Sequence, residues 1–380
     1  MKNNHEVKMM TPFTILLLFV IGLGAVLVIY RLANGLGAAT NLNDDFPWGL
    51  WIGFDMLGGI AMAAGGFLIA GAVYLLNMKK YKPIVRPAVL TAFLGYLLAI
   101  IALMLDLGQP HRIWHPGVMW QVHSVMWVIA MHVIFYTLTL AIEASPVLFE
   151  KLKWQNAVNL VNKIIVPVVL FGVMLSVLHQ SSLGALYLIV PGKLSPLWAT
   201  TFLPYLFLAS AVMMGLSMVS MEAIVSARAF KHKIDFSIIA GLAKGCIIAL
   251  SIYLVLKLYF LATGPGIGAA FAGTMESNMY LLEIIGGIIL PLAILAGRNK
   301  KAESVNGVVL GHILVIAGVL LNRFNVSISG LYGFQSATGS SYFPSMIELL
   351  ITLALVALGI FVYMLIAKYF PLFQEANAEY

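Results

Sequence analysis

Ten long apolar runs dominate the sequence and constrain its fold more than any other feature. A helix needs about 20 apolar residues to cross the hydrocarbon layer of a membrane. Charged residues make up only 10% of the 380-residue chain, against about 25% in soluble domains, which excludes a water-soluble fold. We therefore expect an all-α polytopic membrane protein with ten transmembrane helices in a single integral membrane domain, residues 1–380. The runs cover residues 12–31, 48–77, 87–107, 121–142, 161–184, 201–226, 236–260, 277–297, 304–322 and 345–368.

The order of the spans favours two four-helix bundles. Spans 2 to 5 and spans 6 to 9 each cross the membrane in the same out-in-out-in order, so each set can pack as one bundle. The first bundle is expected at residues 48–184 and the second at residues 201–322. The helices at 12–31 and 345–368 then flank the two bundles.

The basic residues predict the orientation of the chain. Of the 22 Lys and Arg residues, 17 fall on one side of the predicted spans and five on the other. Because cytoplasmic loops carry an excess of Lys and Arg, both termini are expected in the cytoplasm of a prokaryote, with the spans in its inner membrane. The net charge of +7 then reflects topology and not nucleic-acid binding, since the basic residues are divided among the loops.

The outer loops differ from the short, basic inner loops. They are longer, neutral and rich in Gly, Pro and aromatic residues, which is typical of loops that pack on one another or on a docked subunit. These loops cover residues 32–47, 108–120, 185–200, 261–276 and 323–344.

The cysteine count limits the redox chemistry of the chain. Its single cysteine, Cys246, cannot form an intrachain disulfide, bind an iron-sulfur cluster that needs four thiolates, or supply a Cys-rich zinc site. No metal site is predicted in this chain. A redox metal centre must rest on histidine or belong to a partner.

Ionisable residues converge at one depth in the first predicted bundle. Asp55 lies seven residues into its span, about 10 Å deep at the helical rise of about 1.5 Å per residue. Asp106 ends the next span, His123 starts the one after, and His179 lies near the outer end of the fifth. Ionisable groups inside a membrane are costly and mark functional sites by default. Two carboxylates and two imidazoles are thus expected near the outer face.

This combination fits a quinone. The head group needs a hydrogen-bond partner at each carbonyl, and quinol oxidation releases two protons that His or Asp can accept. We predict His123, His179, Asp55 and Asp106 as the reacting groups. Structural alternatives remain open, since Asp106 could bond to backbone or to Arg112, and His123 could simply lie at the membrane interface. The residues expected to bind the quinone are Trp48, Trp51, Gln180, Ser182, Arg112 and Trp120.

Other polar residues in the spans have weaker assignments. Lys257, Glu283, Arg323 and Glu348 balance two against two, which favours buried ion pairs that hold helices together. His132 lies between His123 and Glu143 on one span and is a candidate for a proton path toward the cytoplasm.

Two other classes of protein compete with a quinone-reactive subunit. A b-type cytochrome needs two His on facing helices at one depth, and His123 with His179 is the candidate pair. An ion or solute transporter is expected to have helices broken by Gly or Pro at the midplane, whereas the polar cluster here lies at the outer edge.

Five segments resemble one known family. LDLGQPHRIWHP at Leu105–Pro116 is similar to the signature of the NrfD/PsrC family of quinone-interacting membrane subunits. Four further segments resemble its HybB-like branch, which includes the hydrogenase-2 membrane subunit and DsrP- and HmcC-like subunits. These are FPWGLWIGFD (Phe46–Asp55), HSVMW (His123–Trp127), HQSSLGALYLI (His179–Ile189) and YFPSMIELL (Tyr342–Leu350).

The resemblance implies a haem-free subunit without an iron-sulfur cluster of its own. It would exchange electrons between a menaquinone-type quinone and a ferredoxin-like iron-sulfur subunit docked on the outer face. Beyond that subunit would lie a catalytic module, such as a hydrogenase, a multihaem cytochrome c or a sulfur enzyme. Asp55, Asp106, His123 and His179 fall in the matching motifs, whereas Val128 replaces a glutamate found in relatives. The outer loop Gly108–Trp120 is the expected contact with the partner.

Overall fold

Ten helical spans make up the part of the protein that the structure describes, and the prediction of an all-α membrane fold is confirmed. The computed structural model describes residues 10–46, 48–190, 192–298 and 305–373. Within these ranges, ten helical segments are long and apolar enough to cross a membrane, and no β-strand forms. Six of them are continuous α-helices: α1 (Pro12–Asn34), α7 (Val125–Lys151), α8 (Gln155–Leu186), α9 (Leu203–Phe230), α10 (Phe236–Thr263) and α16 (Met346–Tyr369).

The other four spans change helix type along their length. Span 2 joins η2 (Trp51–Gly58), α3 (Gly59–Ala63), α4 (Gly65–Ala70) and η3 (Gly71–Leu75), and span 3 joins η4 (Lys79–Ile84) to α5 (Val85–Asp106). Span 8 joins α12 (Met275–Ile284), η7 (Ile285–Ile289) and α13 (Leu290–Arg298), and span 9 joins α14 (Val305–Ser327), η8 (Ser329–Leu331) and α15 (Tyr332–Thr338). The segments η2, η3 and η7 are π-helical, a geometry often found at functional sites. Short helices in the connections are α2 (Leu36–Ala39), η5 (Pro110–Arg112), α6 (His115–Val118) and α11 (Ile267–Ala270), and η6 (Tyr187–Ile189) extends α8.

Two predicted loops are largely helical in the structure. Residues 143–160, expected as an inner loop, continue α7 to Lys151 and begin α8 at Gln155. Residues 323–338, expected as an outer loop, complete α14 and form η8 and α15. The predictions stopped where apolar residues gave way to polar ones. A helix continues through polar residues, however, when they lie beyond the lipid or are buried against other helices.

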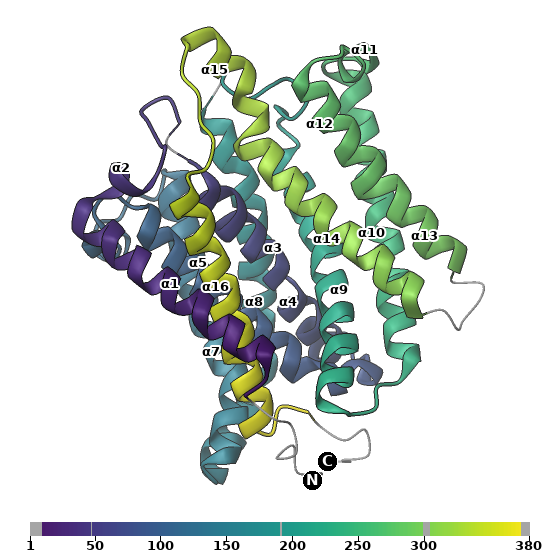
Figure 1. Ribbon diagram of the computed structural model, residues 1–380. Helices are drawn as coiled ribbons and strands as arrows, with labels where there is room; N and C mark the ends of the chain where they lie inside the picture. The colour runs from purple at the N-terminus through teal and green to yellow at the C-terminus, as the bar shows by residue number, and fades with distance from the viewer. Residues whose placement is uncertain (1–9, 47, 191, 299–304, 374–380) are drawn as a thin grey trace.

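The contacts between helices do not divide the spans cleanly into two bundles. We refer to spans 2 to 5 as the first set and to spans 6 to 9 as the second set. α9 packs on α10 and α14 of its own set, and also on α3, α4 and α8 of the first set. α14 likewise packs on η2. In Figure 1, α1 and α16 lie side by side along one edge of the molecule, and they pack extensively on each other.

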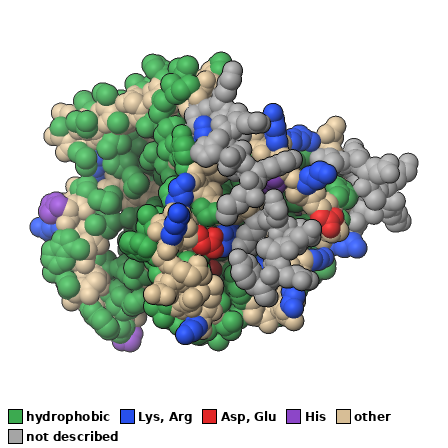
Figure 2. Space-filling view, turned by 90° about the horizontal axis from the view of Figure 1, so that it is seen from below, with side chains coloured by type: hydrophobic (Ala, Val, Ile, Leu, Met, Phe, Trp, Pro, Cys, Tyr) green, Lys and Arg blue, Asp and Glu red, His purple; other side chains and the backbone are tan. Residues whose placement is uncertain are grey.

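One end of the molecule is basic. The start of α1 and the end of α16 both lie at the lower end in Figure 1. Figure 2 looks onto that end and shows Lys and Arg side chains over much of the visible face. Exposed basic residues at the ends of spans or in the connections between them include Lys79, Lys80, Lys151 and Lys231. This distribution is the one that the positive-inside rule associates with a cytoplasmic face.

Small residues let some helices approach closely. A Cβ atom added to Gly287 on η7 would lie 2.6 Å from the Cα atom of Gly318 on α14, and one added to Gly318 would lie 2.3 Å from the Cα atom of Gly287. Close approach between small residues is a main source of helix packing in membranes, where lipid provides no hydrophobic drive for association. Any side chain at either position must therefore separate spans 8 and 9.

We predict that Gly287→Ala destabilises the protein, whereas Gly286→Ala does not. A Cβ atom at Gly286 would meet only the side chain of Leu282, at an ordinary 3.7 Å. Overpacking of a close contact costs typically about 1–3 kcal/mol. The midpoint of thermal unfolding in detergent should fall for Gly287→Ala alone. Equal midpoints for the two variants would contradict this account of the helix contact.

Candidate functional site

Asp55 is buried in the π-helical segment η2, with only 8% of its surface exposed. The hydroxyl of Thr352 on α16 donates a hydrogen bond of 2.6 Å to Asp55 Oδ2. One turn before Asp55, Trp51 Nε1 donates to the backbone carbonyl of Glu348 at 3.3 Å. The last span therefore holds the two predicted site residues of span 2 in place.

Asp106 ends α5 beside a cation that the sequence had not indicated. Arg31 of α1 is buried and donates from Nε to the carbonyl of Leu105 at 2.7 Å and from its terminal nitrogen to that of Leu107. Its charge acts on Asp106, whose buried Oδ1 has no hydrogen-bond partner among the described residues. Arg112, the expected alternative partner, is exposed. Arg31 thus holds the C-terminal end of α5 through backbone carbonyls and forms no hydrogen bond with the Asp106 carboxylate.

Glu348 joins the outer loops to the start of span 2. Its Oε1 accepts 2.6 Å from the Tyr342 hydroxyl, and its Oε2 accepts 2.8 Å from the Ser345 amide, completing a capping box at the start of α16. The same Tyr342 hydroxyl accepts 2.8 Å from the Leu50 amide. Burial and the bond to Glu348 raise the pKa of Tyr342 well above its usual range, so the phenol remains a donor. The prediction that Glu348 pairs with cations of the second set is wrong, because α16 carries it against the first set.

A second group of polar residues lies between α5, α7 and α8. His179 on α8 is fully buried, and neither ring nitrogen has a hydrogen-bond partner among the described residues. Its ring centroid lies 5.7 Å from that of Tyr96 and 6.0 Å from that of His132. His132 Nδ1 lies 3.2 Å from the Ser182 hydroxyl, and Gln180 Nε2 donates to the carbonyl of Ile60 at 2.9 Å. Three predicted residues, His179, Gln180 and Ser182, therefore share one buried region with His132.

Polar side chains continue from this region toward the basic end. On α7, His132, Tyr136 and Glu143 are spaced by four and seven residues, which places them on one helix face. The Ser176 hydroxyl of α8 lies near the phenols of both Tyr96 and Tyr136, and none of these three hydroxyls has a hydrogen-bond partner among the described residues. Glu143 in turn acts on Tyr136. We call these residues, with His179, the polar column.

An apolar hollow separates the polar column from Asp106. Its empty volume is about 170 Å³, between span 2, α5 and α7. On α5, Tyr96 lies one turn inward from the hollow and Asp106 one turn outward, on the same helix face as its lining residues. The hollow is lined by Met56, Ile60, Ala99, Ile100, Leu103 and Val133. It is thus an apolar space with titratable groups at both ends.

Four of the predicted residues lie outside this arrangement. His123 precedes Ser124, the N-cap of α7, and is exposed together with Arg112. Trp120 is 69% exposed. Trp48 packs edge-on against Tyr187 at 5.5 Å between ring centroids. The structure brings Asp55, Trp51 and Asp106 to the end of the first set opposite the basic end, and His179, Gln180 and Ser182 to its interior. It does not add the exposed residues to either group.

Several residues of the site were not predicted. The sequence pattern could have indicated Tyr96 and Tyr136, because Tyr96 shares a helix face with Asp106 and Tyr136 shares one with His132. The sequence could not have indicated Thr352 and Arg31, because nothing in it shows which spans pack against α5 and η2.

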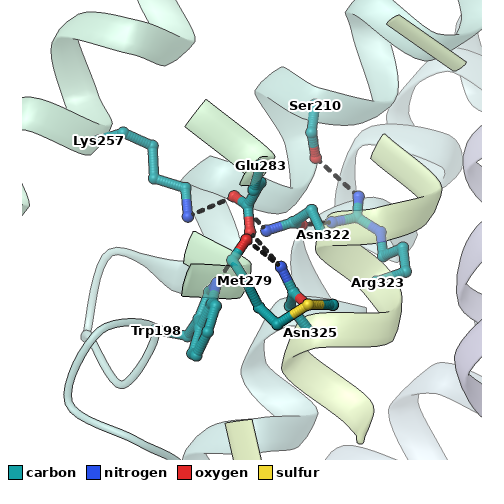
Figure 3. Close-up of polar contacts among 8 residues, drawn as sticks. All are labelled: Trp198, Ser210, Lys257, Met279, Glu283, Asn322, Arg323 and Asn325. Atoms are coloured by element: carbon teal, nitrogen blue, oxygen red, sulfur yellow. Dashed lines mark hydrogen bonds and ion pairs between the residues drawn. The ribbon is translucent and has the colours of Figure 1, made fainter. Parts of the chain in front are cut away.

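The second set contains a separate polar cluster. Lys257 Nζ lies 2.7 Å from Glu283 Oε1, with both side chains almost fully buried, so the prediction of an ion pair is confirmed for these two residues. Figure 3 shows the cluster, in which Trp198 Nε1 and the side-chain amides of Asn322 and Asn325 also donate to Glu283, at 2.9–3.0 Å. Arg323 bonds to Asn322 and Ser210, and not to a carboxylate.

Comparison with known proteins places the chain in a family. Ten spans with a buried acid and imidazole site define a polytopic membrane subunit. The family model described as polysulphide reductase, NrfD matches residues 38–335. The chain belongs to the NrfD family of membrane subunits of quinone-interacting oxidoreductase complexes, as its sequence segments indicated.

Similarity to individual relatives extends over most of the chain. It is 33% identical to the probable Ni/Fe-hydrogenase 2 b-type cytochrome subunit of Escherichia coli, over 91% of this chain and 88% of the relative. It is 31% identical to the menaquinone reductase integral membrane subunit of Nitratidesulfovibrio vulgaris, over 92% and 88%. It is 24% identical to the Hdr-like menaquinol oxidoreductase integral membrane subunit of Archaeoglobus fulgidus, over 89% and 88%.

We predict that Tyr342→Phe destabilises the outer end of the first set, whereas Tyr332→Phe has almost no effect. The first change removes the acceptor of the Leu50 amide and the donor to Glu348 Oε1, while Glu348 Oε2 keeps the Ser345 amide, and the cost is about 1–3 kcal/mol. Tyr332 is 47% exposed and provides the matched control. Thermal unfolding in detergent and protease cleavage of the outer loops measure the difference. An unchanged Tyr342→Phe variant would rule out the stabilising role of this hydroxyl.

Proposed function

We propose that this chain is the quinone-reactive subunit of a respiratory oxidoreductase and that it binds a menaquinone-type quinone in the apolar hollow. The observation that carries this proposal is the hollow itself, an apolar space with Asp106 toward one end and Tyr96 and His179 toward the other. A flat apolar ring system with a polar oxygen at each end matches the polarity of this space, and the side chains that line it must move apart to admit the ring. The name of the Nitratidesulfovibrio relative, a menaquinone reductase subunit, supports the choice of quinone.

The surrounding residues account for the proton chemistry. Oxidation of a quinol releases two electrons and two protons, and reduction consumes them. Asp106 and Asp55 serve the outer end of the hollow, and His179, backed by His132, serves the inner end. Titratable groups within hydrogen-bond reach of a reacting oxygen can accept or return its proton. The electrons pass to a redox centre in a partner, a ferredoxin-like iron-sulfur subunit, because this chain has too few cysteines for a cluster.

The polar column extends the same proposal toward the cytoplasm. It provides titratable or hydroxyl groups from His179 through Tyr96, Ser176 and Tyr136 to Glu143. Val128 replaces a glutamate of relatives, and His132 lies one turn further along α7 on the side that faces His179. In this chain His132 takes the place of that glutamate in exchanging protons with the site.

We predict that Asp55→Asn and His179→Gln lower quinol turnover while the complex still assembles. Loss of one hydrogen bond to a head group costs about 1 kcal/mol, or about 3 kcal/mol when a charged group is left behind. Turnover should therefore fall between several-fold and about a hundredfold. His312→Gln is the matched control, since His312 is equally buried but lies in the second set, where it bonds to Ser217 at 3.0 Å.

Turnover is measured on the complex purified through a tag on this chain, with a soluble menaquinol analogue as donor. Equal losses for His312→Gln and His179→Gln would show that buried histidines matter only for folding. Unchanged turnover in both Asp55→Asn and His179→Gln would reject the hollow as the quinone site.

The proposed orientation in the membrane puts the iron-sulfur partner at the end of the protein nearest the hollow. The loop after α5, residues 107–124, carries exposed apolar side chains at Trp114, Val118, Met119 and Trp120. Exposed apolar patches of this kind mark interaction sites. We propose that this loop faces the outside and contacts the iron-sulfur subunit, and that the basic end faces the cytoplasm.

We predict that single cysteines report opposite sides of the membrane. The natural Cys246 is fully buried and gives no background. Val118→Cys should react with a membrane-impermeant maleimide in intact cells and should crosslink to the partner in the assembled complex. Lys151→Cys, in the exposed hairpin between α7 and α8, should do neither. The reverse labelling would overturn the orientation, and crosslinks only from Lys151→Cys would move the partner to the other face.

The b-type cytochrome alternative loses its ligand pair. His123 is exposed and His179 is fully buried, so these two residues do not face a common site. The Escherichia coli relative is nevertheless named as a cytochrome subunit. A visible spectrum of the purified chain tests the point directly, because a Soret band with α and β peaks would establish a haem.

A further inference from the structure

Arg323 of α14 is a fully buried cation without an acidic hydrogen-bond partner. Its guanidinium donates to three neutral acceptors, Asn322 Oδ1 at 2.7 Å, Ser210 Oγ at 2.7 Å and the carbonyl of Phe207 at 3.2 Å. It also stacks over the Phe207 ring at 3.7 Å, and its Nε has no partner among the described residues. A buried charge of this kind has a high desolvation free energy, and charged residues inside a membrane usually have a functional role.

The neighbouring carboxylate does not neutralise Arg323. Glu283 is the acidic group whose charge reaches Arg323, but it is already paired with Lys257 at 2.7 Å. In Figure 3, Lys257 and Arg323 lie on opposite sides of Glu283, and Asn322 lies between Glu283 and Arg323. Two buried cations thus share one carboxylate, which leaves the cluster with an excess positive charge.

This excess charge lies at the contact between the two sets of spans. Ser327, one turn beyond Arg323, meets span 2 so closely that a Cβ atom added to Gly53 would lie 2.3 Å from its hydroxyl oxygen. Gly53 is two residues before Asp55. On the α8 side, Arg323 acts electrostatically on Tyr187, which also interacts with Asp106. The Tyr187 hydroxyl is buried and lacks a hydrogen-bond partner among the described residues. Tyr187 is therefore within electrostatic range of both the uncompensated cation and Asp106, which lies toward one end of the proposed quinone site.

We propose that Arg323 stabilises negative charge in the quinone site, so that it favours the quinol that has lost one proton, with Tyr187 as the polar group between them. This inference rests on the proposed function. A quinol first gives one proton to a site residue and becomes an anion. The anion then gives two electrons, one after the other, to the partner's iron-sulfur centre, which passes the first on before it accepts the second, and it gives its second proton to the protein, leaving the quinone. A nearby positive charge lowers the free energy of the anion and leaves that of the neutral quinol unchanged.

The charged and titratable groups around this contact come from several helices. A change that makes any of them more positive would favour the quinol anion, and a change that makes any of them more negative would disfavour it. They are Lys257 and Tyr253 on α10, Tyr280 and Glu283 on α12, Tyr187 on η6 and Asp106 at the end of α5. Arg31 on α1, beside Asp106, is a second buried cation near the site, but its bonds hold the end of α5, so Arg323 is the cation chosen for the test.

The expected effect can be scaled from Coulomb's law. A unit charge about 10 Å away, in an effective dielectric of about 20, favours a single negative charge by roughly tenfold. Removing the charge of Arg323 should therefore move the pH at which quinol oxidation becomes fast upward by about one unit.

The test is the pH dependence of quinol oxidation by the purified complex carrying Arg323→Gln or Arg323→Lys. In a plot of oxidation rate against pH, Arg323→Gln should move the rising limb to higher pH by about one unit. Arg323→Lys should keep the wild-type profile because it keeps the charge. Ser210→Ala removes one hydrogen bond to Arg323 and leaves its charge, so it should not move the limb. If Arg323 only holds helices together, the variants will differ in yield and thermal stability but not in pH profile.

Two further measurements keep the outcome decisive. Tyr187→Phe retains Arg323 and should also move the limb upward, by less than Arg323→Gln, which provides a test if Arg323→Gln does not assemble. Binding of a menaquinol analogue to each variant is measured in parallel. If the wild-type complex binds no analogue, the proposed function fails. If it binds and responds to Asp55→Asn, but neither Arg323→Gln nor Tyr187→Phe moves the limb, only the role of Arg323 is overturned.

Discussion

The cost of placing charge in hydrocarbon governs the internal arrangement of this protein. Each strongly buried ion has been given specific partners: Glu283 accepts four hydrogen bonds, Glu348 closes a capping box, and Arg31 donates to the carbonyls that end α5. Such contacts connect spans that are distant in sequence, since Arg31 lies in the first span and α5 in the third. The polar residues thereby fix which helices are neighbours, a task for which apolar packing in lipid is poorly suited.

Some of the buried polar groups without a hydrogen-bond partner among the described residues lie near the site. His179, Asp106 and Tyr187 each bury a polar atom without a hydrogen-bond partner among the described residues. Buried polar groups are normally satisfied, and exceptions call for an explanation. Here they surround an apolar hollow, so a ligand with oxygens at both ends would satisfy groups that the folded chain leaves free.

The sequence predicts the spans well because hydropathy measures the property that inserts a helix. Counting residues along the spans places Asp55, Asp106, His123 and His179 at one depth, and that common depth stays a prediction. The sequence does not predict the direction in which each side chain points. Asp55 faces Thr352 on α16, whereas His179 faces Tyr96 and His132, and only tertiary packing separates these two surroundings. His123 was placed with them by depth alone, and its exposure shows the limit of that argument.

The dependence of span 2 on α16 has a consequence for biogenesis. Trp51, Asp55 and Leu50 all depend on contacts from residues 342–352, near the end of the chain. Membrane proteins are inserted from the N-terminus onward, so the first nine spans reach the bilayer before these partners exist. The outer end of the first set is therefore completed last. A chain that stalls or is cleaved before α16 would retain nearly all of its spans but lack the contacts that hold Leu50, Trp51 and Asp55 in place.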